Sequence, residues 1–436
     1  GSGGSDSQTD FGQKGQDIYA DIISGDMALT ASAFRWYNRI AQLDVTSNFL
    51  RGENRIVWRY YYRIIRSANT IIQNLGGNDV TPESDADKYA MGQAKTMRAH
   101  SFFYLAQYFQ KEYNGAEPIL PMPIEPGSNL PKSTAQEVYD LMEKDLTEAI
   151  SLLDGFNRTS KNQVNKDIAQ TMYAYVLGAR GTDYPKMALM TQNVINAGNF
   201  TIKPSNDLVD GFNDASDNSW MWGIDIVSEN GLGLVSWWGQ IDAFSYSYGW
   251  AGDYKAMDAD LFNQIPANDA RKEQFIDAPS SGRNLQPLSK FYWSADALAS
   301  FSFGSGPQVG VTADYVYMRV EEAYLLNAEA NARSGNDGAA RTSLKAMVSN
   351  RVPDASYIDA LSGQALLDEI YLQTRIELWG EGKSYLAMKR NKATINRSAN
   401  HLFLSNTSIS YDDERMTFEI PQDEIQNNPF LNDQNQ

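Results

Sequence analysis

The chain of 436 residues contains no cysteine and only two histidines, His100 and His401. The absence of cysteine excludes disulfide bonds, thiolate zinc sites and a cysteine nucleophile. With only two histidines, a histidine-rich metal site is excluded as well. The sequence also lacks any run of 18 or more apolar residues, so no segment is predicted to span a membrane.

Basic residues are fewer than acidic ones: 37 Lys and Arg stand against 54 Asp and Glu, which gives a formal net charge of −17. This balance argues against a nucleic-acid or anionic-membrane partner and suits neutral ligands better. The hydrophobic fraction of 42% and the charged fraction of 21% are ordinary for a globular protein. The length allows a large core, in two or three domains or in one extended helical scaffold.

The chain divides into four segments by composition and periodicity. Residues 1–12 are rich in Gly, Ser and Asp and predict a flexible tether. Because the chain starts with GSGGS and not with Met, we expect a processed or recombinant start whose export signal was removed. Residues 13–200 have helical periodicity, residues 201–313 are loop-rich and aromatic, and residues 314–436 return to helix before a tail.

Several predicted helices carry start or stop signals. Helices are predicted at residues 54–75, from Thr81-Pro82 onward, behind a capping box at 134–137, at 165–180 and at 184–197. The second of them is apolar on two sides over residues 94–109, so it must lie between neighbouring helices. Successive helices that pack in pairs predict a mainly α, tetratricopeptide-like helical-pair scaffold. We expect it to carry a large irregular loop-rich insertion and few short strands. One short strand is predicted at 417–420.

Residues 375–390, RIELWGEGKSYLAMKR, contain two glycines that interrupt a helical pattern, Gly380 and Gly382. Each mid-helix glycine costs about 1 kcal/mol relative to alanine. We therefore expect the backbone of a neighbouring element to approach closely there.

This segment resembles the C-terminal signature of SusD/RagB-like proteins. Four further stretches resemble that family in the same order: WRYYYRIIRSAN at 58–69, KTMRAHSFFYL at 95–105, YMRVEEAYLLNAEA at 317–330 and IPQDEIQNNP at 420–429. Two departures are present. Ser384 and Ala387 stand where relatives often have an Arg and an Asp, which indicates that an ion pair was lost as a unit. The C-terminus also lacks the Pro-Gly-Tyr in which many relatives continue.

The resemblance implies an outward-facing outer-membrane lipoprotein of a starch utilization system-like type. Such a protein binds oligo- or polysaccharide without cleaving it and delivers it to a SusC-like TonB-dependent transporter. The resemblance also implies an N-terminal lipid anchor as the contact with the membrane, on a cysteine that this chain does not contain. No cofactor and no nucleic acid are implied. RagB-type relatives leave peptide capture open as an alternative.

Aromatic residues are concentrated in the loop-rich region. Five of the nine tryptophans lie between residues 220 and 250. Trp220 and Trp222 alternate with apolar neighbours like a buried strand. Aromatic faces stack on sugar rings, and a few polar groups beside them fix the ligand. Loops concentrate binding residues, and neighbouring glycines favour exposed loops for the remaining aromatics. The candidate ligand-binding residues here are Trp237, Trp238, Gln240, Asp242, Tyr246, Tyr248 and Trp250. An aromatic core for the loop-rich region is an equally good explanation.

A second aromatic and polar cluster lies between the early helices, with Trp36, Tyr37, Asn48 and Arg51. The resemblance implies that ligand is held between a loop of the N-terminal helices and loops of the inserted region, which would bring these residues to the tryptophan loops. Trp293 is a further candidate. The competing explanation is that Trp36 and Trp293 serve only as structural anchors.

Acidic residues provide two further hypotheses. A glycosidase acid and base could come from Glu321, Glu322, Glu329, Glu377 and Glu381, since such enzymes use a spaced pair of carboxylates. Nearby Arg and Lys residues favour structural ion pairs for these carboxylates instead, so we expect that the protein is not an enzyme. Two alternatives remain: a glycoside hydrolase on a helical-pair scaffold, and a transporter adaptor without a sugar site. The acidic loop at 207–217 could bind calcium through oxygen atoms, but its spacing fits turn-forming Asp and Asn better.

Overall fold

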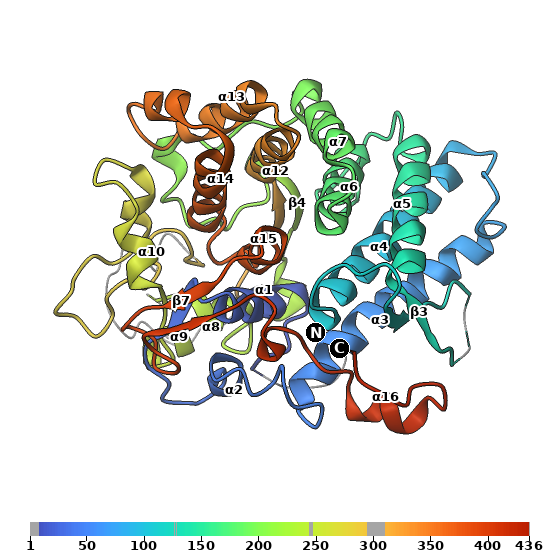
Figure 1. Cartoon of the computed structure of the whole chain (residues 1–436), viewed down its shortest axis with the longest axis horizontal. Helices are drawn as coiled ribbons and strands as arrows, with labels where there is room; N and C mark the ends of the chain where they lie inside the picture. Colours follow the sequence, from blue (N-terminus) through green and yellow to red (C-terminus); the bar gives the residue numbers. More distant parts are fainter. Residues whose placement is uncertain (1–7, 126, 128, 244–246, 294–309, 436) are drawn as a thin grey trace. The chain divides into compact units, whose positions relative to one another are not determined.

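The computed structural model describes most of the chain and divides it into two units (Figure 1). The described residues are 8–125, 127, 129–243, 247–293 and 310–435. Unit 1 comprises Gly3–Leu43 and Gly198–Tyr411, and unit 2 comprises Asp44–Ala197 and Asp412–Gln436. Helices predominate and the described strands form only two-stranded sheets, which confirms the predicted mainly α fold.

Unit 2 is a series of helices that pack in chain order (Figure 1). Its helices are α3 (Gly52–Asn74), α4 (Asp85–Phe109), α5 (Ala135–Leu152), α6 (Lys166–Arg180), α7 (Tyr184–Ala197) and α16 (Gln422–Asn427), with a 3-10 helix at Glu414–Met416. Strands β2 (Pro118–Pro121) and β3 (Lys132–Thr134) form its antiparallel pair. Helix α3 packs on α4, α4 on α5, α5 on α6 and α6 on α7. Because α4 lies between α3 and α5, it buries both sides, as its two apolar stripes predict.

Local signals determine where these helices begin and end. The Thr134 hydroxyl accepts a hydrogen bond from the Glu137 backbone N–H, and the Glu137 carboxylate accepts one from the Thr134 N–H at 2.8 Å. Asn165 caps α6 through the Ile168 N–H, and Gly181 ends that helix with φ of 72°. These are side chains satisfying backbone groups that a helix terminus leaves free. The predicted bounds of α6 and α7 are confirmed.

In its described residues, unit 1 combines helices with three short antiparallel strand pairs. Its helices are α1 (Gln13–Ile23), α2 (Asn38–Ala41), α8 (Trp237–Ile241), α9 (Tyr248–Ala251), α10 (Ala259–Asn263), α12 (Val320–Arg333), α13 (Asp337–Val348), α14 (Gly363–Glu377) and α15 (Ser384–Asn391). The strand pairs are β1 (Met27–Leu29) with β5 (Lys255–Met257), β4 (Trp220–Ile224) with β6 (Tyr315–Arg319), and β7 (Ile395–Arg397) with β8 (Thr407–Ile409). Its 3-10 helices are Ser205–Asp207, Ser228–Asn230, Ala270–Gln274 and Ser356–Ala360. The buried strand predicted around Trp220 is confirmed as β4.

The two glycines predicted to admit a close neighbour do so, within unit 1. Gly380 and Gly382 lie between α14 and α15 with φ of 81° and 73°. A Cβ on Gly380 would lie 2.3 Å from Cε2 of Phe291, and one on Gly382 would lie 2.7 Å from Cα of Asp17 in α1. The Asp21 carboxylate of α1 accepts a hydrogen bond from the Gly380 N–H at 2.6 Å. Helix α1 therefore packs directly against the backbone of residues 380–382.

Two local predictions are wrong. Residues 417–420 form no strand, because Phe418 N–H donates to Tyr108 and Glu419 N–H to Thr46, which gives no continuous partner strand. Gln8 and Thr9 are buried and not part of a flexible tether, since the Tyr19 hydroxyl donates to the Thr9 carbonyl at 3.1 Å. Among the described residues, no helix has the length and apolar character needed to cross a bilayer.

Candidate functional site

An aromatic surface lies in unit 1, where the segment after β1 meets α9. Phe34 is 43% exposed and Trp36 is 37% exposed. Both rings lie edge-on to the half-buried Tyr248, at centroid distances of 5.0 and 6.0 Å. Large aromatic side chains are usually buried, so two exposed ones against a third indicate a contact surface. We call Phe34, Trp36 and Tyr248 the aromatic surface.

The backbone that carries this surface is fixed by pairing with the segment before β5. Beyond the β1–β5 ladder, Thr30 N–H donates to the Tyr254 carbonyl and Ala33 N–H to the Gly252 carbonyl, each at 2.9 Å. Phe34 N–H then donates to an Asp253 carboxylate oxygen at 2.9 Å. Arg35, between the two exposed rings, has a left-handed φ of 66°, which is uncommon for a side chain of this size. Backbone strain of this kind often accompanies functional loops.

A cation lies between two further half-buried aromatic rings of unit 1. The Arg283 guanidinium is 5.6 Å from the centre of the Trp250 ring and 5.1 Å from that of Tyr254. It also donates to the Trp250 carbonyl at 2.8 Å and to the Ala243 carbonyl at 3.3 Å. Burial lowers the pKa of Arg283. This arrangement fixes the Trp250 segment and gives it a polar group.

A buried polar network connects to the aromatic surface through Tyr248. The Gln8 amide donates to the Tyr248 hydroxyl at 3.4 Å, and Gln240 donates to Gln8 at 3.0 Å. The Lys255 ammonium donates to Gln240 at 3.1 Å and lies 4.6 Å from the centre of the Tyr37 ring. Burial lowers the pKa of Lys255 to about 8. Tyr37 and Gln240 are themselves buried, so they support the surface and present no group to a ligand on it.

The exposure predicted for Trp237 and Trp238 is wrong. Both are essentially inaccessible, at 1% and 0% exposure, and lie on α8. Trp237 packs on Phe291 at 5.1 Å, and the Trp238 indole donates to the Ala313 carbonyl at 2.9 Å. A Cβ on Gly239 would lie 2.0 Å from a backbone oxygen. The glycine beside these tryptophans therefore reflects tight packing and not an exposed loop.

The remaining predicted site residues are buried, half-buried, outside the described residues, or in the other unit. Asp242 is buried and accepts from the Trp293 N–H at 3.1 Å, which positions the half-buried Trp293. Tyr246 lies outside the described residues. Asn48 and Arg51 belong to unit 2, where Arg51 pairs with Asp44 at 2.7 Å.

The glutamates offered as a catalytic pair are buried in an ion cluster. Arg319 contacts Glu381 at 2.9 Å and both Glu321 and Glu377 at 3.1 Å. Arg351 bonds Glu377 at 2.7 Å. Burial would raise the pKa of Glu381, but Arg319 and Lys290 outweigh it and lower that pKa to about 2. These carboxylates are buried partners of arginines, as the structural explanation predicts, and are not open to a substrate.

The acidic loop lines a cavity of about 310 Å³. A cation of the chain itself is among the lining residues, because the Lys203 ammonium contacts the carboxylates of Asp210 and Asp217. Within the described part of the chain, no three acidic or histidine side chains gather in a way that could hold a metal ion. The calcium hypothesis stays a prediction, and the contacts of Lys203 favour a turn-forming role.

Sequence reasoning missed Phe34 and Arg283. Phe34 directly precedes the Arg35-Trp36 pair, so an exposed aromatic could have been read from the cluster. Nothing near Arg283 in the sequence indicates that it meets Trp250 and Tyr254, because that contact depends on tertiary structure.

Comparison with known proteins identifies the family. A family model described as "SusD family" matches residues 156–436, well over half of the chain. The chain belongs to the SusD family. A second model, described as "Starch-binding associating with outer membrane", matches residues 9–176 of this SusD-family protein. Among curated protein sequences, none matches significantly.

Solved structures show the same fold. A SusD-like carbohydrate binding protein from Bacteroides vulgatus has a TM-score of 0.81 at 20% identity, covering 96% of this chain and 91% of that one. A SusD superfamily protein from Bacteroides thetaiotaomicron has a TM-score of 0.80 at 22% identity, covering 98% and 95%. One from Bacteroides fragilis has a TM-score of 0.76 at 21% identity, covering 96% and 92%. At these identities the likeness establishes the fold.

Proposed function

We propose that this chain binds an oligosaccharide on the aromatic surface of unit 1 and does not cleave it. The observation that carries the proposal is the pair of exposed rings, Phe34 and Trp36, set edge-on to Tyr248. Exposed aromatic faces stack on the apolar C–H faces of sugar rings, and the hydroxyl of Tyr248 offers a polar group beside them. The family and the SusD-like carbohydrate binding protein of the same fold support this choice of ligand.

The half-buried Trp250, Tyr254 and Trp293 are further candidate contacts, with Arg283 as a hydrogen-bond donor. Each is half-buried and therefore partly accessible in unit 1. Trp237, Trp238, Tyr37, Gln240 and Asp242 are assigned to the packing beneath them. Binding on such a surface needs no acid or base, which agrees with carboxylates that are held in ion pairs.

We further propose that the chain acts at the outer face of the outer membrane and delivers its ligand to a SusC-like TonB-dependent transporter. The family membership and the matching description "Starch-binding associating with outer membrane" support both statements. An N-terminal lipid anchor, as the family implies, is the proposed contact with the membrane. Co-purification of a tagged chain with its transporter from outer membranes tests the partnership.

Affinity gel electrophoresis across neutral and charged polysaccharides tests the binding. Trp36→Ala should weaken binding of the retained polysaccharide about 30-fold, the effect of losing roughly 2 kcal/mol at a central aromatic contact. Phe430→Ala is the control, since Phe430 is an exposed aromatic of unit 2, at 54%. Equal retention of the two variants would refute the site, and release of shortened sugar would favour a hydrolase.

A further inference from the structure

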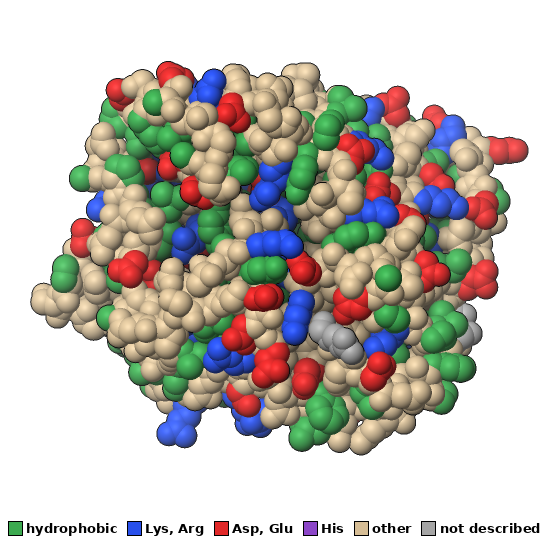
Figure 2. Space-filling model, viewed as in Figure 1, with side chains coloured by type: hydrophobic (Ala, Val, Ile, Leu, Met, Phe, Trp, Pro, Cys, Tyr) green, Lys and Arg blue, Asp and Glu red, His purple; other side chains and the backbone are tan. Residues whose placement is uncertain are grey.

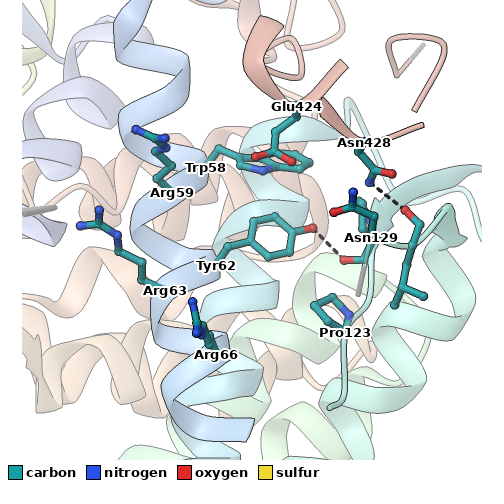
Figure 3. A pocket seen from close by; sticks show the side chains of 11 residues that line it. Trp58, Arg59, Tyr62, Arg63, Arg66, Pro123, Asn129, Glu424 and Asn428 are labelled. Carbon is teal, nitrogen blue, oxygen red and sulfur yellow. Dashed lines mark hydrogen bonds between the residues drawn. The ribbon is translucent and has the colours of Figure 1, made fainter. Parts of the chain in front are cut away.

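A second pocket, which the proposed function does not use, lies in unit 2 beside α3 (Figure 3). Its volume is about 240 Å³, below the range of roughly 300–1,000 Å³ typical of pockets for drug-sized ligands. A cavity of this size fits one ring and not a chain of rings. Its lining residues are Trp58, Arg59, Tyr62, Arg63, Arg66, Pro121, Pro123, Asn129, Leu130, Glu424 and Asn428.

The pocket has an aromatic centre with a basic rim. Figure 3 shows the Trp58 and Tyr62 rings pointing toward the loop after β2. Arg59, Arg63 and Arg66 follow one another along α3, and the charged ends of Arg59 and Arg63 are drawn on the side away from that loop. The two rings lie 4.7 Å apart between centroids, and Tyr62 is half-buried. The Tyr62 hydroxyl donates to the Pro121 carbonyl at 2.7 Å, which holds the loop against α3.

The basic rim comes from a row of arginines at spacings of four, four and three along α3. Residues at such spacings share a helix face, and like charges there oppose one another. Arg55 pairs with Asp423 at 3.2 Å, and Arg59 interacts with Glu424. Arg63 and Arg66 are exposed and have no acidic partner among the described residues. A row of four arginines is unusual in a chain of net charge −17. On the face shown in Figure 2, by comparison, acidic and basic side chains are interspersed.

We propose that this pocket binds an oxyanion carried on a sugar ring, a carboxylate or a sulfate ester, with the ring against Tyr62. A planar guanidinium matches the two oxygens of such a group and forms charge-assisted hydrogen bonds to it. Tyr62 and the flanking prolines give an apolar wall for the ring. The sugar component rests on the proposed function, whereas binding of an oxyanion does not.

Among the described residues that line the pocket, Glu424 is the one that is acidic. Burial raises the pKa of its carboxyl, and Arg59 and a hydrogen bond from Trp58 oppose that rise. A negative charge there opposes an anionic ligand. Removing it should therefore tighten binding, an effect that loss of folding cannot imitate.

Isothermal titration calorimetry with methyl glucuronide, glucose 6-sulfate, neutral methyl glucoside and inorganic sulfate tests the proposal on the full chain. The charged sugars should bind more tightly than methyl glucoside, and salt raised from about 0.05 M to about 0.5 M should weaken them by screening. Arg63→Gln with Arg66→Gln should lower affinity at least about tenfold, as expected for losing one charge-assisted hydrogen bond. Glu424→Gln should raise it, and Arg415→Gln, on a residue outside the pocket, should leave it unchanged.

Equal binding of neutral and charged sugars, or no effect of the double arginine variant, would overturn the proposal. So would capture of anionic lipid vesicles by a chain that binds none of the charged sugars. Trp36→Ala separates this proposal from the first. If the aromatic surface binds no glycan but the pocket keeps its uronate, only the proposed function fails; if Trp36→Ala abolishes uronate binding, this assignment fails.

Discussion

Replacing Gly380 by alanine should destabilise the protein, for two reasons seen in the structure. Its φ of 81° is left-handed, which costs an L-residue about 1–2 kcal/mol. The new Cβ would lie 2.3 Å from Cε2 of Phe291, a ring that is fully buried, and overpacking of this kind adds about 1–3 kcal/mol. The expected loss in the free energy of unfolding is about 2–5 kcal/mol.

Urea unfolding followed by circular dichroism measures this loss, with Gly338→Ala as the control. Gly338 lies on α13, its φ is not positive, and nothing lies within 4 Å of the position of its Cβ. Alanine there should raise stability by up to about 1 kcal/mol, since it has the better helix propensity. If Gly380→Ala leaves the free energy of unfolding unchanged or raises it, as Gly338→Ala should, the close approach of the neighbouring elements is not what requires the glycine.

Three further outcomes follow from the buried groups of unit 1. Arg319→Met should cost about 3–5 kcal/mol in urea unfolding, because it removes a cationic partner from the buried carboxylates of Glu377 and Glu381; a cost below about 1 kcal/mol would contradict this. Because folding lowers the pKa of Glu381 from an ordinary 4.5 to about 2, its contribution of about 3 kcal/mol is present above pH 4.5 and lost as the pH falls toward 2. Acid unfolding of Glu381→Gln should show a shallower pH dependence there, and an unchanged slope would exclude this source. Trp238→Ala should lower stability by about 3–5 kcal/mol, as for a buried aromatic, and a stable variant with weakened glycan binding would restore Trp238 to the ligand site.

The sequence predicts much of the helical scaffold because its signals are local. The Thr134 capping box and the Asn165 cap involve residues three apart, so their hydrogen bonds can be read directly from spacing. In the same way, the pair of glycines at 380 and 382 predicts that a neighbouring element approaches the backbone closely. The partner that approaches, α1, lies more than 350 residues away, and nothing in the motif names it.

The candidate site is less predictable because exposure is a tertiary property. Trp36 and Trp238 are both tryptophans with polar and aromatic neighbours in the sequence, yet one is 37% exposed and the other 0%. The difference comes from hydrogen bonds to residues far away in the sequence. The Trp238 indole donates to the Ala313 carbonyl, whereas the segment before Trp36 is fixed by its backbone contacts with residues 252–254. Family resemblance identifies the scaffold, and the three-dimensional packing selects the residues available to a ligand.

Calorimetric titration of the wild type and of Trp36→Ala, with an oligosaccharide from whichever polysaccharide is retained in the gel, tests the central claim most directly. The account predicts saturable binding by the wild type, recovery of intact sugar afterwards, and an affinity about 30-fold lower for Trp36→Ala. Unchanged affinity of Trp36→Ala, or recovery of shortened sugar, would contradict a glycan-binding function at the aromatic surface.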